Sequence, residues 1–261
     1  MPRWLVRLLD LLNRRGKSLA VRVVYWTGKA PDPIHPKHLI DAPWHNWYLE
    51  HIRCMDKILD LGCGNGSHLL RAAEACHSII GVDTDRAQLA IATRTIRERG
   101  RALRAVVLRQ DLTHGLPWPS GSFDGILCLD VLEHVAPRVA VLRECHRVLT
   151  PDGWLALAVP NRETIWRHRL RAAGIFAYSD PDHKTEYTRE ELVAELAAGG
   201  FEPAGPIKPI VYDTPWAGLI DVIGGLSLTI YRRLSVWKRN AALRHPEEST
   251  GFRVVARKIP P

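Results

Sequence analysis

Cysteine is scarce in this chain, and the spacing of its cysteines suggests no bridge. The 261 residues include five cysteines and no C-x-x-C pair. An odd number argues against a disulfide framework, and a reducing compartment suits free thiols. We therefore predict buried, unpaired thiols in apolar or helical stretches at Cys54, Cys63, Cys76, Cys128 and Cys145.

An apolar run long enough to cross a membrane is also lacking. A spanning helix needs about 18 consecutive apolar residues, and residues 215–231 come nearest but contain Asp221 and a glycine pair. Arg3 and Arg7 interrupt any apolar core of a signal peptide. We expect a cytoplasmic protein, with a peripheral location at the inner membrane face as an open alternative.

The sequence also lacks histidines, cysteines and acids at the spacing of a known metal site. Four histidines cluster ahead of residue 52, but their spacing matches no ligand template and no cysteine or acid completes a set. The sequence therefore predicts no metal site.

Basic charge, in contrast, is concentrated in two stretches. Out of a net charge of +8, residues 1–30 carry +6 and residues 232–245 carry +5, which leaves −3 for the rest. A mildly acidic body with two basic flanks suggests an anionic surface, such as a membrane, as partner.

Residues 1–30 are predicted to be a separate amphipathic segment ahead of a domain that covers 31–261. Over residues 3–15, Trp4, Leu8 and Leu12 repeat at helical spacing, and Arg7 and Arg14 recur on the opposite face. Two interpretations stay open: a helix packed on its own domain, or an interfacial membrane helix.

The chain is organised around a short apolar run that ends in an acid and is followed by alternate glycines. Residues 58–61 predict a buried strand and residues from Ser67 onward predict a helix. Gly62, Gly64 and Gly66 occupy the turn between them, where glycine permits positive φ and close approach of a ligand to the backbone. Ser67 stands where the dinucleotide pattern G-x-G-x-x-G needs glycine, which disfavours an NAD oxidoreductase.

A second apolar run ends in Asp83, an acid placed to accept hydrogen bonds from both hydroxyls of a ribose. Strands and helices then alternate, with strands over 57–61, 78–83, 104–110, 124–129 and 153–159, and helices over 67–76, 85–99 and 137–149. This alternation predicts a parallel sheet with helices on both faces. A capping box at Thr188 and Glu191 opens a further helix that ends at Ala198.

These segments together resemble the class I S-adenosylmethionine (SAM) dependent methyltransferase family, in particular its small-molecule, quinone and lipid methyltransferases. The matching stretches are residues 58–66, 81–83, 110–112, 116–124, 126–135 and 153–161. The resemblance implies an α/β, Rossmann-like fold with a seven-stranded, mostly parallel sheet. Its seventh strand, 252–258, would insert antiparallel between the fifth and sixth, and a helical insertion or cap would fill residues 213–249.

The same resemblance implies SAM as the cofactor. Asp60 would hold the ammonium group through the glycine loop, Asp83 would accept from the ribose, and Asp111 would accept from the adenine amino group. The full implied set of cofactor residues is Asp60, Gly62, Cys63, Gly64, Gly66, Asp83, Thr84, Asp111, Leu112, Leu129 and Asp130.

His134 is the candidate for acid–base catalysis. Methyl transfer to oxygen needs the acceptor hydroxyl deprotonated as it attacks, and a neutral imidazole suits that task near pH 7. A helix predicted over 38–52 and the loop ahead of Thr188 supply candidate acceptor-site residues: Trp44, Tyr48, His183 and Tyr187.

We expect a SAM-dependent methyltransferase for a small-molecule or lipid-linked acceptor, with a hydroxyl oxygen as the target. Two other functions stay open: a nucleic-acid methyltransferase, and a SAM-binding membrane protein without catalysis. The D/N-P-P-Y/F tetrad used on flipped bases is absent, and Val159-Pro160-Asn161 stands at the fifth strand. The identity of the acceptor, the atom methylated and the oligomeric state cannot be read from the sequence.

Overall fold

The computed structural model of the protein describes residues 1–40, 42–100 and 104–259. The chain divides into two compact units, each assembled from separate stretches. The sheet unit comprises Asn46–Pro160, Asp182–Lys208 and Phe252–Pro261, and the helical unit comprises Met1–His45, Asn161–Pro181 and Pro209–Gly251. The domain boundary predicted after residue 30 stays a prediction.

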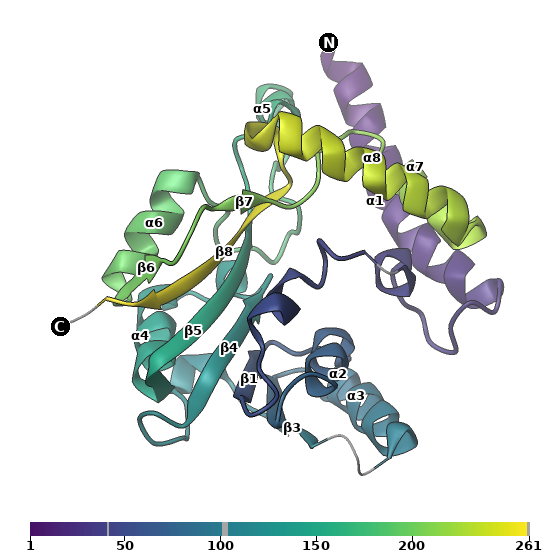
Figure 1. Ribbon diagram of the computed structural model, residues 1–261. Helices are drawn as coiled ribbons and strands as arrows, with labels where there is room; N and C mark the ends of the chain where they lie inside the picture. Colours follow the sequence, from purple (N-terminus) through teal and green to yellow (C-terminus); the bar gives the residue numbers. More distant parts are fainter. Residues whose placement is uncertain (41, 101–103, 260–261) are drawn as a thin grey trace. The chain divides into compact units, whose positions relative to one another are not determined.

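The sheet unit is built on an eight-stranded sheet with the order β3-β2-β1-β4-β5-β8-β6, and β7 pairs with β8 beside this path (Figure 1). The strand β8 lies between β5 and β6 and is antiparallel to β6, which confirms the predicted place of the strand at 252–258. The bounds are β1 (Lys57–Leu61), β2 (Ser78–Asp83), β3 (Ala105–Arg109), β4 (Phe123–Leu129), β5 (Leu149–Pro160), β6 (Phe201–Pro203), β7 (Lys208–Pro209) and β8 (Gly251–Lys258).

The five strands from β3 to β5 run parallel, which brings their carboxyl ends to one edge of the sheet. Asp60 pairs in register with Gly81 on β2 and with Leu127 on β4. Gly125 lies opposite Trp154, and a Cβ at Gly125 would meet the Trp154 ring at 2.4 Å. The strand β4 therefore needs glycine there to lie flat beneath the indole.

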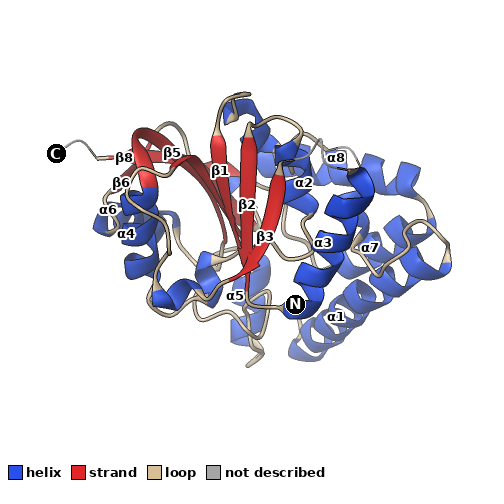
Figure 2. Cartoon of the chain, turned by 90° about the horizontal axis from the view of Figure 1, so that it is seen from below, coloured by secondary structure: helices blue, strands red, loops and turns tan. Residues whose placement is uncertain are grey.

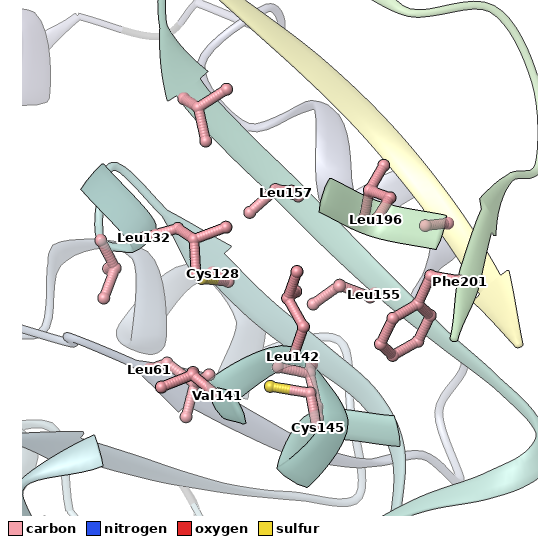
Figure 3. Packing of buried hydrophobic residues seen from close by; sticks show 14 of the residues in the cluster. Leu61, Cys128, Leu132, Val141, Leu142, Cys145, Leu155, Leu157, Leu196 and Phe201 are labelled. Carbon is pink, nitrogen blue, oxygen red and sulfur yellow. The ribbon is translucent and has the colours of Figure 1, made fainter. Parts of the chain in front are cut away.

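Helices cover both faces of the sheet, as Figure 2 shows. On one face α4 (Arg138–Val148) and α6 (Arg189–Ala198) pack on alternate residues of the strands, such as Leu155 and Leu157 (Figure 3). On the other face α2 (Ser67–Ala73) and α3 (Arg86–Arg99) pack on the intervening residues, such as Ile58 and Ala156. This alternation is the period of two expected of a strand buried on both sides.

Two predicted helix boundaries in this unit follow from caps. The Asp85 side chain accepts from the backbone nitrogens of Ala87 and Gln88 and so begins α3. Thr188 and Glu191 form the reciprocal capping box that begins α6. Each cap satisfies backbone N–H groups that a helix start otherwise leaves without partners.

The helical unit contains α1 (Arg3–Trp26), α5 (Ile165–Ala172), α7 (Ala217–Leu226) and α8 (Leu228–Arg244), with short 3₁₀ helices η1 (Pro36–Leu39) and η5 (Pro246–Glu248). The predicted insertion at 213–249 is helical, with α7 and α8 joined at Ser227, whose side chain caps α8. Helix α1 lies along α7, and α7 contacts α8 (Figure 1).

Two predicted elements were wrong in extent. The helix expected over 38–52 is replaced by η1 and by η2 (Trp47–His51), because Pro43 has no backbone N–H and breaks the pattern. The helix expected over 3–15 runs on to Trp26 through Gly16. Gly16 lies against Gly218 of α7, where a side chain would collide with that backbone at 2.6 Å, so this contact requires glycine inside the helix.

Two smaller departures concern cysteine and β5. Cys54 is exposed and Cys76 is half-buried, whereas Cys63, Cys128 and Cys145 are buried as expected, and all five are free thiols. The strand β5 begins at Leu149, four residues before the predicted start.

In the described ranges no helix is long and apolar enough to cross a membrane.

Candidate functional site

The turn that follows β1 places three glycines in the left-handed region, two against neighbouring side chains and one beside open space. Gly62, Gly64 and Gly66 have φ of 63°, 51° and 81°. A Cβ at Gly62 would meet the Val131 side chain at 2.5 Å, and one at Gly66 would meet Ala92 at 3.1 Å. A Cβ at Gly64 would meet nothing within 4 Å. Gly62 and Gly66 thus serve packing, and Gly64 borders open space.

Asp83 lies at the end of β2 and holds this turn. Its Oδ2 accepts from the Gly64 backbone nitrogen at 2.8 Å, and its Oδ1 accepts from the Asp85 nitrogen at 2.9 Å. Each carboxylate oxygen has a further acceptor site, so the half-buried Asp83 can still bind a pair of hydroxyl donors. Thr84 follows it on the surface.

Asp60 is a buried carboxyl beneath the glycine turn. It is 2% exposed, and among the described residues its Oδ2 has no hydrogen-bond partner. Burial, and after it the neighbouring charge of Asp83, raises the pKa of Asp60 to about 8. An acid of this kind is stabilised by a cationic donor. Cys63, buried next to it, has a raised pKa from the same burial and serves packing.

The acids beyond β3 and β4 lie at the same carboxyl edge of the sheet. Asp111 is exposed and begins a 3₁₀ helix, and its Oδ1 accepts from the Thr113 nitrogen at 2.9 Å. This bond is the main cause of its lowered pKa. Leu112 beside it is buried. Leu129 is half-buried. Asp130 has a φ of 58°, a strained backbone conformation that non-glycine residues rarely adopt.

A group of acids and histidines stands just beyond these residues. The imidazoles of His134 and His183 meet edge to face, with centroids 4.5 Å apart. His183 Nδ1 lies 2.9 Å from Glu186 Oε1, and His183 Nε2 lies 3.9 Å from Glu133 Oε1. The Lys184 backbone nitrogen donates to the Glu133 carbonyl at 2.7 Å, which ties the two segments together. His134 is exposed, whereas His183, Glu133 and Glu186 have little contact with solvent.

Glu133, His134 and His183 could also hold a metal ion, although the sequence predicts none. Each offers one ligand atom, and these atoms lie within 4.8 Å of one another. Glu186 on His183 Nδ1 would orient the imidazole as an outer carboxylate does in many metal sites. Two features of the sequence could have indicated this site: the acid next to His134 (Glu133) and the acid three residues after His183 (Glu186). The sequence-based prediction used neither.

The other predicted acceptor residues are dispersed. Tyr48 is buried, with its hydroxyl 3.0 Å from His68 Nδ1. Tyr187 is buried and donates from its hydroxyl to Glu195 Oε1 at 2.8 Å. Trp44 belongs to the helical unit, where it packs against Ile40, Ala42, Ile220 and Tyr231. A role for these three in acceptor binding stays a prediction.

Comparison with known proteins supports one family. Residues 59–157 match the family described as "Methyltransferase domain". The ubiquinone biosynthesis O-methyltransferase of Pseudomonas aeruginosa is 35% identical over 130 residues, 49% of this chain and 54% of that protein. A probable S-adenosylmethionine-dependent methyltransferase of Mycolicibacterium smegmatis is 32% identical over 155 residues, 58% of this chain and 54% of that protein. The chain spans about half the length of the curated relatives it matches.

Solved structures share the fold at low identity. The cyclase SpnF matches with a TM-score of 0.61 at 22% identity, over 82% of this chain and 79% of that one. The 1,6-didemethyltoxoflavin-N1-methyltransferase of Burkholderia thailandensis, with bound 1,6-didemethyltoxoflavin and S-adenosylhomocysteine, matches with a TM-score of 0.55 at 18% identity, over 84% and 77%. One of these proteins is a cyclase, so the fold alone does not decide the reaction.

Proposed function

We propose that this chain, which carries a methyltransferase domain of the class I S-adenosylmethionine-dependent family, transfers a methyl group from SAM to a hydroxyl oxygen of a small-molecule or lipid-linked acceptor. The observation that carries the proposal is the buried Asp60 carboxyl, whose Oδ2 has no partner among the described residues. It lies in the strand that leads directly into the turn at Gly64, where space is open.

The residues present fit the cofactor. Asp60 would face its ammonium group, and Asp83 would accept from its ribose hydroxyls with the acceptor sites left by Gly64 and Asp85. Asp111 and Leu112 would border the adenine, and Leu129 and Asp130 would complete the wall. When bound, SAM supplies an electrophilic methyl group on a sulfonium. The acids on three successive parallel strands are what the chain contributes, and the carboxyl edge of a parallel sheet is where such ligands bind.

Proton removal from the acceptor falls to the two histidines. His134 is the exposed member of the pair and therefore the one that an acceptor can reach. His183 is held by Glu186 at Nδ1, which favours the tautomer with the proton on that nitrogen. We assign His134 as the base that takes the hydroxyl proton. His183 is a positioning residue that fixes the plane of the His134 ring.

The acceptor in this proposal is a small-molecule or lipid-linked compound with a free hydroxyl. Support comes from the relatives, one of which is a ubiquinone biosynthesis O-methyltransferase. A histidine base suits a hydroxyl of ordinary acidity better than an amine, because a base is needed only for the hydroxyl. A catalytically inert SAM-binding protein and an RNA methyltransferase are the alternatives that the test must separate.

The test is a radiolabel transfer assay. The purified chain is incubated with SAM labelled in the methyl group and, separately, with catechol or quinol compounds, with extracted polar lipids, and with total RNA. We expect labelled product from the small-molecule or lipid pool, and none after Asp83→Ala. Label recovered in RNA would overturn the acceptor class. Tight SAM binding in calorimetry with no transfer to any pool would overturn the enzymatic function.

A further inference from the structure

Helix α1 of the helical unit turns a large apolar surface outward. Its inner face is narrow and consists of Val6, Leu9, Ala20 and Val24. Its exposed large side chains are more numerous: Trp4, Leu8, Leu11, Leu12, Leu19, Tyr25 and Trp26. Exposed apolar patches on a protein surface mark interaction sites when their side chains are contiguous.

Close contacts between glycines fix how α1 lies on α7. Gly16 meets the backbone of Gly218, and Val23 meets Gly225, seven residues later on both helices. The two helices therefore run parallel, in a fixed register. The Gly218 nitrogen donates to Asn13 Oδ1, and the Thr27 hydroxyl donates to the Gly225 carbonyl at 3.2 Å, which anchors both ends of the contact.

This register puts the apolar residues of both helices on one side of the pair. Leu12, Leu19 and Trp26, spaced by seven, flank the contact on one side of α1. Lys17 flanks it on the other side, where it interacts with Asp221 of α7. Leu219 and Leu226 lie on the flank of α7 away from Asp221, so they share the side of Leu19 and Trp26. Trp26 and Leu226 are 67% and 62% exposed.

Basic residues border this apolar face, and the two carboxylates that α1 and α7 carry lie elsewhere on these helices. Arg15 and Arg22 follow Leu12 and Leu19 by three residues, which places them one turn along and next to the apolar row. Both are exposed. The acids of the two helices are paired elsewhere: Asp10 with Arg14 at 2.8 Å, and Asp221 with His35 at 3.2 Å.

We propose that the apolar face of the α1–α7 pair, made of Leu12, Leu19, Trp26, Leu219 and Leu226 and bordered by Arg15 and Arg22, docks in the plane of an anionic lipid surface. Aliphatic and indole side chains enter the acyl boundary, and the guanidinium groups pair with lipid phosphates. The positive border selects an anionic bilayer over a second copy of this equally basic face. The inference deepens the proposed function, because a docked enzyme would take its acceptor from the bilayer.

Co-sedimentation with vesicles tests the docking. The purified chain is mixed with vesicles of phosphatidylcholine alone, or of phosphatidylcholine with about one third phosphatidylglycerol. We expect binding to the anionic vesicles only, weakened by 0.5 M salt. The Arg15→Gln and Arg22→Gln changes should each lower the partition coefficient about fivefold, the equivalent of about 1 kcal/mol per basic residue near an anionic surface. Leu19→Gln should lower it about tenfold.

Matched controls come from the sheet unit. Leu108 on β3 is exposed to the same degree as Leu19, at 42% against 41%, so Leu108→Gln should leave the partition unchanged. Arg97→Gln on α3 serves the same purpose for charge. Equal losses from Leu19→Gln and Leu108→Gln, or binding to neutral vesicles alone, would overturn the proposal. A dimer in light scattering that dissociates with Leu19→Gln would assign the face to a second copy instead.

The docking proposal and the proposed function can be contradicted independently of each other. SAM binding is measured by calorimetry on the same preparations, without vesicles. A chain that binds vesicles but not SAM would contradict the enzymatic proposal and leave the docking intact. A chain that binds SAM and stays in the supernatant with anionic vesicles at low salt would contradict the docking alone.

Discussion

The Asp83 carboxylate accepts a hydrogen bond from the Gly64 backbone nitrogen at 2.8 Å, across 19 residues of chain. The acid at the end of β2 therefore shapes the turn that follows β1, in addition to any bond with a ligand. A residue at this position has two effects on the site, since it holds the glycine turn and presents acceptors to a ribose.

Replacing Asp83 should weaken the cofactor site. Asp83→Ala removes hydrogen bonds to a charged group worth ~1.5–3 kcal/mol each, so SAM affinity in calorimetry should fall at least ~10-fold. Asp85→Ala is the control, because it removes only the cap of α3, at a cost of about 1 kcal/mol in stability. Unchanged SAM affinity in Asp83→Ala would contradict the assignment.

The glycines of the turn should separate folding from binding. Gly62→Ala adds a Cβ 2.5 Å from the Val131 side chain at positive φ, so thermal denaturation should show a clear loss of stability. Gly64→Ala meets open space and should cost only the backbone strain of about 1–2 kcal/mol. We expect Gly64→Ala to fold and to bind SAM at least ~10-fold more weakly. Similar behaviour of both variants in both measurements would argue against open space for a ligand at Gly64.

Asp60 should make stability depend on pH. Its folded pKa of about 8 lies above the ordinary value near 3.9 of an unfolded chain. The folded state then holds a proton that the unfolded state has lost, so the stabilising contribution is complete below about pH 4 and is lost as the pH rises toward 8. Chemical denaturation should show wild type losing stability relative to Asp60→Asn over this window.

The protonation state of Asp60 should also affect the affinity for SAM. An ammonium group binds the ionised carboxyl better than the neutral one, so SAM affinity should rise as the pH approaches 8 and should lose this rise in Asp60→Asn. A parallel pH dependence of affinity in wild type and Asp60→Asn would place the ammonium elsewhere.

The two histidines should differ in kinetics. His134→Ala should keep SAM affinity and lower turnover by ~10²–10⁴, as expected for a lost general base. His183→Ala should leave part of the turnover and move the ionisation seen in the pH–rate profile, because His183 acts through the His134 ring. If His134→Ala keeps near-normal turnover while His183→Ala loses it, the two roles are reversed.

The donor set of Glu133, His134 and His183 should bind a divalent cation if its geometry serves that purpose. Calorimetry with Zn²⁺ and Mg²⁺ on the chain without SAM should then show one site, lost in Glu133→Gln and weakened in Glu186→Gln, which removes the partner of His183. Glu190→Gln is the control, as an exposed acid in the same stretch. Absence of binding in wild type would leave the histidines to proton transfer alone.

The parallel sheet could be predicted because each of its strands is a short apolar run that ends in a polar residue. The positions of Asp60, Asp83 and Asp111 followed from strand ends, which topology brings to one edge. The antiparallel place of β8 followed only from the family resemblance. Nothing local in residues 252–258 states which strands flank it, since pairing is decided by tertiary contacts.

The helical unit was harder to predict, because its features depend on distant residues. Gly16 ends a helix by local rules, yet Gly218 makes it a point of contact. The amphipathic pattern of α1 was recognised, but which of its faces is buried depends on Gly218 and Gly225. The Glu186–His183 bond was missed for a similar reason, since one acid near one histidine is common in sequences and becomes informative only beside Glu133.

The parallel contact of α1 with α7 has a consequence for synthesis of the chain. Asn13 and its partner Gly218 are 205 residues apart. At 5–20 residues per second, a ribosome takes roughly 10–40 s to cover that distance. During this interval α1 carries both an unburied inner face and its arginine-rich outer face, with its partner helix not yet made. Closing so long a loop is entropically slow, so the folding order of the helical unit depends on what the nascent helix meets before α7 arrives.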